Sequence, residues 1–276
     1  MATAPIIDLH SHSRASDGQH PAAEVAAMAA SAGVGVWALT DHDTVAGIAE
    51  AEAAAARHGL RLVPGIELST FLDRREIHVL GHFVDPASPA VRDFQALLEE
   101  KRRVRMGEIV QKLAEVGVAV HPDDIEKHSG GKLLGRPHVA RALMDRGYVS
   151  TVKEAFDLWL GEGKPAYVGR FRLEARDAIA LVRGAGGTAT IAHPGLSRVE
   201  RGDLSRLRDW GLAGVEVSHP EQNPSVREKY RALAAELGLV PTAGSDFHGD
   251  VVAPGRRFGD CSMTGEELAA LEARRP

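Results

Sequence analysis

Cysteine is almost absent from this sequence of 276 residues, which contains only Cys261. A single cysteine excludes an intramolecular disulfide and any metal site built from several thiolates. The sequence also lacks an apolar run that approaches the roughly 18 residues of a membrane-spanning helix. Its beginning, MATAPIIDLHSHS, has neither the basic nor the apolar region of a signal peptide. We therefore expect a protein of the reducing cytoplasm without a membrane partner.

An excess of positive charge is lacking as well. There are 33 basic and 38 acidic residues, which give a net charge of −5. No global charge attracts the chain to a polyanion, so any contact with nucleic acid would have to be local. The length and the hydrophobic content of 44% fit one large domain, or one domain with a sizeable insertion. No sequence feature indicates an obligate protein partner.

Short β-rich segments alternate with alanine-rich helical segments along most of the chain. The expected strands are 5–10, 34–40, 61–67, 76–83, 187–193, 213–218 and 239–245. The expected helices are 21–33, 44–58, 173–186, 202–210 and 223–238. This alternation predicts an α/β fold with a parallel sheet and crossover helices, and about seven strands indicate a barrel.

The stretch 89–170 interrupts this alternation, because it has the pattern of mostly helical structure. We interpret it as a helical insertion that caps the active site of a barrel formed by 1–88 and 171–276. It is the most basic part of the chain, and most of its charges are typical of a solvated helix face. Arg136 differs, because it lies between Gly135 and Pro137 on a tight loop that would hold its guanidinium ready for an anion.

Side chains that can bind metal gather at the C-terminal ends of the expected strands, which is where parallel α/β barrels build their active sites. His10 and His12 are two residues apart, so in an extended chain their imidazoles point to the same side. The other strand ends and their loops contribute further imidazoles and carboxylates: Asp17, Asp41, His42, Asp43, Glu67, His78, His193, His219, Asp246 and His248. Seven of the 13 histidines lie at these ends, which chance placement does not explain.

Imidazole and carboxylate ligands without sulfur suit zinc, manganese or iron better than calcium. The candidate ligands are too many for one ion and enough for two or three, with a carboxylate as the bridge. Such cations clamp a phosphoryl group and supply hydroxide near neutral pH. Ser11 and Ser13 lie near the ligands, but no base is paired with them, so attack by hydroxide is the simpler mechanism. His219 could protonate the leaving oxygen or orient a ligand.

The motifs DLHSHSRASDG, LTDHDT, GIELS, IHVLGHF, AHP and GSDFHG resemble the PHP (polymerase and histidinol phosphatase) family of the amidohydrolase superfamily. The resemblance covers nearly the whole chain, and GGKLLGRPHVARAL resembles the TrpH-like subgroup. It implies a distorted seven-stranded barrel with up to three metal ions. By motif, it assigns His10, His12, Glu67 and Asp246 to the first ion, Glu67, His78 and His193 to the second, and Asp17, His42 and His248 to the third. Some members carry histidine at the position of Asp17, so the third site is the most variable.

The resemblance also implies a nucleotide substrate, either a nucleoside 3',5'-bisphosphate such as pAp or the 5' end of a short RNA. One phosphate would lie on the cations and the other on basic residues of the insertion, for which Lys132, Arg136 and Arg170 are candidates. Histidinol phosphate carries a cationic amine and would need an acid there, but the segment 130–140 has none.

We therefore predict a hydrolase that removes the 3'-phosphate and leaves a nucleoside 5'-monophosphate, through a hydroxide that bridges the metals. Its expected catalytic residues are Glu67, Asp246 and His219. The expected cofactors are two or three divalent cations, Mn²⁺ in the first place and Zn²⁺ or Fe²⁺ as alternatives. The other functions considered are a 5'-to-3' exonuclease on 5'-phosphorylated RNA, a histidinol-phosphate phosphatase, a hydrolase of C–N bonds and a non-catalytic PHP module.

Overall fold

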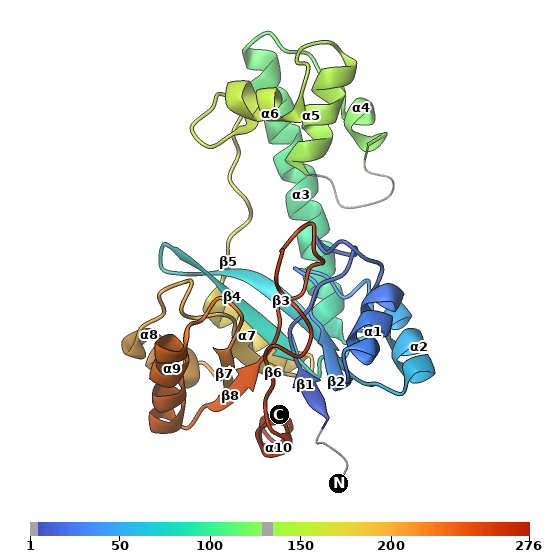
Figure 1. Cartoon of the computed structure of the whole chain (residues 1–276). Helices are drawn as coiled ribbons and strands as arrows, with labels where there is room; N and C mark the ends of the chain where they lie inside the picture. Colours follow the sequence, from blue (N-terminus) through green and yellow to red (C-terminus); the bar gives the residue numbers. More distant parts are fainter. Residues whose placement is uncertain (1–4, 129–134) are drawn as a thin grey trace. The chain divides into compact units, whose positions relative to one another are not determined.

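The computed structural model describes residues 5–128 and 135–276. The chain divides into two compact units, one formed by Met1–Arg92 with Leu173–Pro276 and the other by Asp93–Arg172. Within the described ranges, the first unit contains every strand (Figure 1). The strands are β1 (Ile6–Asp8), β2 (Val34–Leu39), β3 (Arg61–Leu72), β4 (Arg75–His82), β5 (Leu173–Glu174), β6 (Thr188–Ile191), β7 (Gly214–Ser218) and β8 (Val240–Ala243).

Helices accompany the strands in this first unit, and helices make up the regular structure described for the second. Those of the first unit are α1 (Ala22–Ser31), α2 (Ile48–His58), α7 (Ala175–Gly184), α8 (Arg201–Asp209), α9 (Pro224–Leu237) and α10 (Gly265–Glu272). The remaining helices are α3 (Pro89–Glu115), α4 (Pro122–Glu126), α5 (Arg136–Asp145), α6 (Val152–Ala155) and the π-helix η1 (Phe156–Leu160). No helix among the described residues is long and apolar enough to span a bilayer.

The strands follow one another in the order β1-β2-β3-β4-β6-β7-β8, and β5 pairs with β3. Most neighbours are parallel, but β4 is antiparallel to both β3 and β6. The predicted parallel sheet is therefore interrupted at β4, which runs antiparallel to both neighbours. The physical reason is the connection: only Asp73 and Arg74 separate β3 from β4, which is enough for a hairpin and far too short for a crossover.

Backbone hydrogen bonds join the two edges of the sheet beyond the ends of the outer strands. The N–H of Leu9 donates to the carbonyl of Ala243 (3.0 Å), and the N–H of Asp246 donates to the carbonyl of His10 (2.9 Å). A third bond runs from the N–H of His12 to the carbonyl of Phe247 (2.8 Å). These bonds place the segment after β1 beside the segment after β8. The expected α/β class is confirmed.

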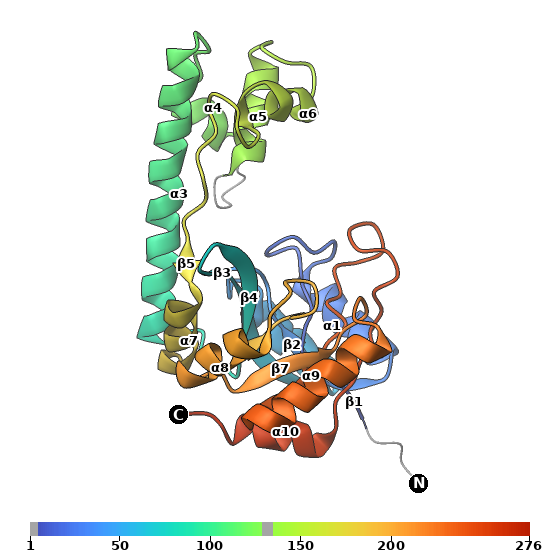
Figure 2. The same cartoon turned by 90° about the vertical axis from the view of Figure 1, so that its left-hand side faces the viewer.

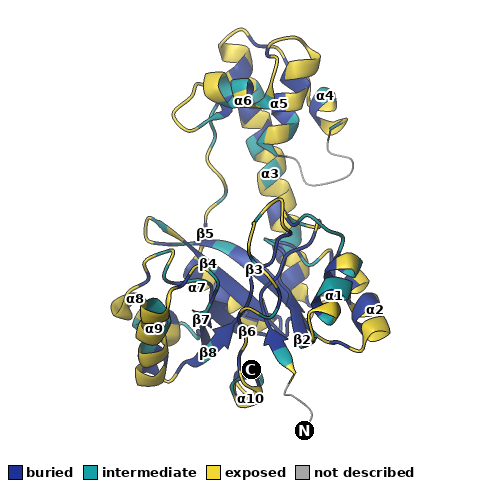
Figure 3. Cartoon of the chain, viewed as in Figure 1, coloured by how far each residue is buried: buried dark blue, intermediate teal, exposed yellow. Residues whose placement is uncertain are grey.

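Several helices cover the sheet, because they present an apolar face to it. In α1 the buried residues are Ala22, Val25, Ala26 and Ala29, which follow the spacing of a single helix face. Their small side chains let the helix approach β2 closely, while α7 packs on β3, β4 and β6. Figure 2 shows α9 lying over β7, which it contacts along with β8. Figure 3 shows the result, with buried strands and helices that are exposed on one face.

The second unit has an apolar core of its own. Ile109 and Leu113 of α3 pack with Ile125 of α4 and with Val139 and Leu143 of α5, and all five side chains are buried.

Candidate metal centre

Glu67 of β3 lies at the centre of the candidate site and is only 1% exposed. Its two carboxylate oxygens face different imidazoles. Oε2 lies 3.1 Å from Nε2 of His10 and 3.1 Å from Nε2 of His12. Oε1 lies 2.8 Å from Nδ1 of His78 and 3.2 Å from Nε2 of His193. One buried carboxylate thus connects two sets of possible metal ligands.

Asp246 approaches the same pair of histidines from the segment after β8. Its Oδ1 lies 3.2 Å from Nε2 of both His10 and His12, and these two nitrogens are 3.1 Å apart. Two imidazole nitrogens that meet in front of two carboxylate oxygens have the arrangement of ligands that converge on one cation. This compact group of His10, His12, Glu67 and Asp246 is the set that the sequence motifs assign to the first ion.

Two further groups in the described chain are compact enough to hold an ion. One is His42, Glu67 and His78, and the other is His12, Asp17, His42 and His248. Asp17 is exposed on its loop, with Oδ1 3.4 Å from Nε2 of His248 and Oδ2 3.8 Å from Nε2 of His42. The groups differ from the motif-based sets in two details. His42 takes the place of His193 beside His78, and His12 joins the third set.

Ser11 and Ser13 have structural partners that explain the orientation of the histidines beside them. The hydroxyl of Ser11 donates to the carbonyl of Ala38 (2.7 Å) and accepts a hydrogen bond from the indole of Trp37 (2.8 Å). Ser11 therefore points towards β2, and the two histidines around it point to the opposite side. The hydroxyl of Ser13 donates to Oδ2 of Asp41 (2.7 Å).

Two candidate ligands have a backbone conformation that is rare for residues other than glycine. His193 has a φ of 28° and Asp246 a φ of 50°. Strain of this kind persists only where neighbouring contacts hold the residue, and it concentrates at functional sites. The backbone N–H of His193 donates to Oε2 of Glu216 (2.7 Å), and that of Asp246 donates to the carbonyl of His10 (2.9 Å).

Glu216 is a functional residue that the sequence analysis missed. It is fully buried in β7, and its Oε1 accepts a hydrogen bond from Nδ1 of His10 (2.9 Å). A metal-binding histidine commonly donates its second ring nitrogen to a carboxylate in this way, which fixes the ring and its tautomer. Glu216 thereby leaves Nε2 of His10 facing Glu67 and Asp246. The available signal is the single acid within the apolar run GVEVS.

Asp41 was noted at a strand end, and the structure gives it a supporting role. It is buried, and its carboxylate accepts hydrogen bonds from the backbone N–H of Ser13 (2.7 Å) and from the hydroxyl of Ser16 (2.6 Å). These contacts fix the loop that carries Asp17.

His219 has a partner at each ring nitrogen. Its Nδ1 accepts a hydrogen bond from the backbone N–H of Glu221 (3.1 Å), so Nε2 carries the proton and donates to Oδ2 of Asp246 (3.1 Å). This is the arrangement of a histidine that orients a ligand, one of its two predicted roles. The structure does not test the other role, proton donation to a leaving group.

The charges of the cluster favour ionised carboxylates. Burial alone would raise the pKa of Glu67, but His42, His10 and His78 hold it well below its usual range. Burial also opposes protonation of His12, yet hydrogen bonds to Asp246 and Glu67 raise its pKa to about 9. Burial lowers the pKa of His42 to about 4. A cation that enters this cluster therefore meets negative oxygens and displaces protons from some of the imidazoles.

The donor set fits divalent cations. Imidazole nitrogens and carboxylate oxygens are the ligands that manganese, zinc and iron accept. Within residues 5–128 and 135–276, Nδ1 of His12 and Nδ1 of His193 are buried without a hydrogen-bond partner. Buried polar atoms are rarely left unpaired in a folded protein, and Nδ1 of His12 lies 3.7 Å from Oδ1 of Asp17, within the group of His12, Asp17, His42 and His248.

The residues predicted to grip the substrate lie in the second unit. Arg136 begins α5, where its Nη1 donates to the carbonyl of Leu160 (3.0 Å) and its guanidinium lies over the rings of Phe156 and Tyr167, at 5.3 and 5.4 Å. Arg170 is exposed. Lys132 lies outside the described residues.

The fold and this cluster of imidazoles and carboxylates define a metal-dependent phosphoesterase. The family model of the PHP domain matches residues 8–159, and the chain belongs to the PHP family. One relative is a 3',5'-nucleoside bisphosphate phosphatase from Chromobacterium violaceum, which is 36% identical over 96% of this chain and 93% of its own length. Another is the 5'-3' exoribonuclease Rnm from Salmonella typhimurium, which is 36% identical over 89% of this chain and 86% of its own length. A solved structure from Bifidobacterium adolescentis, provisionally described as a metal-dependent phosphoesterase, has a TM-score of 0.76 at 28% identity and covers 100% of this chain and 98% of its own. The chain is a hydrolase of phosphate esters.

Proposed function

We propose that this protein is a phosphatase that removes the 3'-phosphate of nucleoside 3',5'-bisphosphates with the help of divalent cations, Mn²⁺ in the first place. The observation that carries the proposal is the placement of Glu67, whose two oxygens face separate groups of imidazoles. This is the geometry of a carboxylate shared by two adjacent ions. Bound cations would supply Lewis acidity towards the phosphoryl group and would activate water near neutral pH.

The candidate ligands would form three groups, and two further residues would support them. His10, His12, Glu67 and Asp246 would hold one cation, and Glu67 would hold a second together with His78 and His193. The exposed Asp17 would complete a third site with His42 and His248. Glu216 keeps the ring of His10 in place, and His219 holds a proton at Nε2, next to Asp246.

Basic residues of the second unit support a substrate with a second phosphate. Burial, together with the charges of Arg136 and Arg170, lowers the pKa of Arg105 to about 10. These guanidinium groups therefore lie close enough to repel one another, and a bound anion relieves such repulsion. We propose that Arg136 and Arg170, with Lys132, hold the phosphate that is not cleaved. The named activity of the Chromobacterium violaceum relative agrees with this substrate.

A second candidate function is 5'-to-3' hydrolysis of short 5'-phosphorylated RNA. Its support is the Salmonella typhimurium exoribonuclease, which matches this chain at the same identity of 36%. Both substrates present a phosphate to be gripped and an ester to be cleaved, so the proposed roles of the cations and of the arginines apply to either.

The test compares kcat/KM for pAp, a short 5'-phosphorylated RNA and histidinol phosphate, with Mn²⁺ added to the full chain. The proposal expects release of inorganic phosphate from pAp with the highest kcat/KM. Release of mononucleotides from RNA at a higher kcat/KM than turnover of pAp would establish the exonuclease instead. The variant Glu67→Ala serves as the control for contaminating phosphatases.

A further inference from the structure

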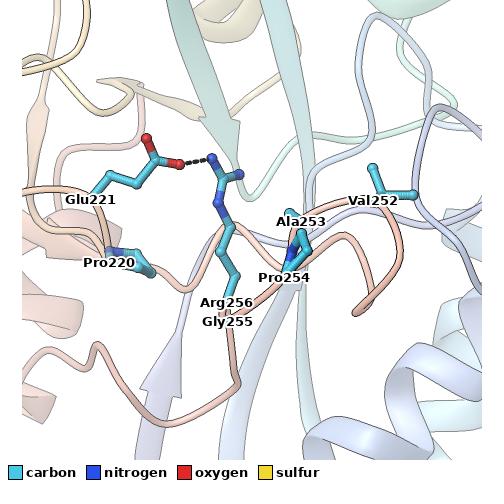
Figure 4. A pocket seen from close by; sticks show the side chains of 7 residues that line it. All are labelled: Pro220, Glu221, Val252, Ala253, Pro254, Gly255 and Arg256. Carbon is cyan, nitrogen blue, oxygen red and sulfur yellow. Dashed lines mark hydrogen bonds and ion pairs between the residues drawn. The ribbon is translucent and has the colours of Figure 1, made fainter.

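Arg256 lies in the loop after Asp246 and His248, and neither the proposed ligand sets nor the proposed substrate contacts include it. Its side chain is 19% exposed. Figure 4 shows it reaching towards Glu221 at the wall of a cavity of about 390 Å³. The rest of the wall consists of small and apolar residues: Pro220, Val252, Ala253, Pro254 and Gly255.

The guanidinium of Arg256 has two acidic partners. Its Nη1 donates to Oδ2 of Asp246, and its Nη2 donates to Oε1 of Glu221. Nη1 also lies 3.2 Å from the backbone carbonyl oxygen of Asp246. The arginine therefore holds both the side chain and the backbone of Asp246, and Glu221 holds the arginine from the outer side.

The two oxygens of Asp246 have separate surroundings. Oδ1 lies 3.2 Å from Nε2 of His10 and 3.2 Å from Nε2 of His12. Oδ2 is engaged by Arg256 and by Nε2 of His219, the latter at 3.1 Å. A carboxylate that is fixed through one oxygen presents the other in a set direction. Restraint matters here, because the φ of 50° at Asp246 is a left-handed conformation that is strained for a residue with a side chain.

We propose that Arg256 is a positioning residue of the metal centre. It fixes Asp246 through Oδ2, so that Oδ1 alone faces the cation, and the ion pair with Glu221 keeps Arg256 in this orientation. The inference rests on the metal centre of the proposed function and is independent of the substrate.

The direction in which the Mn²⁺ affinity changes when Arg256 is replaced distinguishes a positioning role from a simple charge effect. A guanidinium next to a cation site repels the cation, so removal of the charge alone would tighten metal binding. Loss of the fixed orientation of Asp246 would weaken it. In our proposal the loss of orientation is the larger effect.

The experiment titrates Mn²⁺ into the metal-free full chain. Arg256→Ala should weaken Mn²⁺ binding about 10- to 100-fold, the usual cost of losing a group that orients a metal ligand. Arg256→Lys should restore part of the affinity, because an ammonium can reach one acceptor but lacks the planar fork. Arg257→Ala is the matched control: it removes the same charge from the same loop, where Arg257 is exposed. It should bind Mn²⁺ as the unchanged protein does.

Kinetics at saturating Mn²⁺ give a second readout. Arg256→Ala should lower kcat and leave KM nearly unchanged, because the arginine orients a ligand and does not touch the substrate. A rise in KM with kcat unchanged would overturn the proposal and assign Arg256 to substrate binding. Unchanged or tighter Mn²⁺ binding in Arg256→Ala, or an equal loss in Arg257→Ala, would overturn it as well.

Glu221→Gln keeps the proposal testable if Arg256→Ala does not fold, as judged by its thermal transition. This variant removes only the outer partner of Arg256 and should weaken Mn²⁺ binding in the same direction by a smaller factor. Unchanged affinity would count against the proposal. A chain that binds no Mn²⁺ at all would overturn the proposed function and this inference together. If the Mn²⁺ titrations give the expected results but none of the substrates is hydrolysed, only the proposed function would be overturned.

Discussion

The two units of the chain use their interiors in opposite ways. In the unit of strands, the buried residues include carboxylates and imidazoles such as Asp8, His10, Glu67, Glu216 and Asp246. In the part of Asp93–Arg172 that the structure describes, the buried side chains are apolar. Burying charged groups is costly unless they are paired or bind metal. The unit of strands therefore buries charged groups in order to bring metal ligands together, whereas the described part of Asp93–Arg172 buries apolar side chains that pack against one another.

Glu67→Ala should have the largest effect, because it removes the carboxylate that connects both groups of imidazoles. We expect kcat to fall by about 10²- to 10³-fold, the range for removing one electrostatic contact to a transition state. Metal content should fall as well, while the far-ultraviolet circular dichroism stays native. Metal analysis and phosphate release measure the two effects. Full metal content in the variant would contradict the bridging role, and Glu52→Ala on the exposed side of α2 is the control.

Arg136→Ala tests whether the second unit contributes to substrate recognition. A charge-assisted hydrogen bond to phosphate is worth about 1.5–3 kcal/mol, so kcat/KM for pAp should fall roughly 10- to 150-fold. Hydrolysis of a simple aryl phosphate should hardly change. An equal loss on both substrates would make the arginine structural, as its hydrogen bond to the carbonyl of Leu160 would allow. Arg141→Ala, an exposed arginine of the same helix, is the matched control.

Asp17→Asn separates catalysis from stability at the exposed margin of the cluster. Asp17 belongs to the loop, so we expect the free energy of unfolding to change by no more than about 0.5 kcal/mol. Turnover should fall by at least about tenfold, the lower range for losing a carboxylate that supports a metal site. Steady-state kinetics and denaturant unfolding test this. Wild-type turnover would mean that the third group of ligands is not catalytic.

His82→Gln tests the cost of a buried polar residue outside the ligand set. Burial lowers the pKa of His82 to about 4, and its Nε2 donates to the carbonyl of Leu9 (2.9 Å). Below the ordinary pKa of 6.5 the unfolded chain binds a proton at His82 that the folded chain excludes, so the contribution of His82 makes stability fall as the pH drops from 6.5 to 4. The slope is about 1.4 kcal/mol per pH unit.

Glutamine can keep the hydrogen bond to Leu9 but does not titrate. The variant should therefore lose less stability than the wild type across this interval, as measured by urea unfolding at several pH values. An unchanged slope would show that His82 is not the titrating group.

Ile109→Val should have the smallest effect and tests the independence of the two interiors. It removes one methylene from the apolar core of the second unit and should destabilise by about 0.5–1.5 kcal/mol. Mn²⁺ affinity should not change, because the compact ligand groups of the described chain all lie in the other unit. Weaker Mn²⁺ binding would show that the two interiors are coupled.

Much of the site could be predicted from the sequence, because ligands at strand ends follow a simple rule. Once strands are identified by their apolar runs, the C-terminal ends of the parallel strands meet at one rim, and the histidines there are conspicuous. His10, His12, Glu67 and Asp246 lie together as expected. The direction of β4 was missed because the residues of a strand carry no information on whether it runs parallel, and only the short connection at Asp73 does.

Supporting residues were harder to predict than ligands. Glu216 and Arg256 gain their roles from partners far away in the sequence, His10 and Glu221 respectively. A glutamate among valines or an arginine in a loop has many ordinary explanations, and nothing local distinguishes this one. The short β5 and the helix α10 were not expected either. Two residues are too few to show a period, and β5 depends on pairing with β3.

The hydrogen bonds that join the segment after β1 to the segment after β8 have a consequence for protein synthesis. The ribosome makes His10 and His12 long before it makes Asp246. While the chain is growing, the group of His10, His12, Glu67 and Asp246 therefore lacks one member until the segment after β8 emerges. A chain released early carries the histidines without this aspartate. A cation bound by all four residues of this group therefore indicates that translation has passed β8 and that the segments after β1 and β8 have come together.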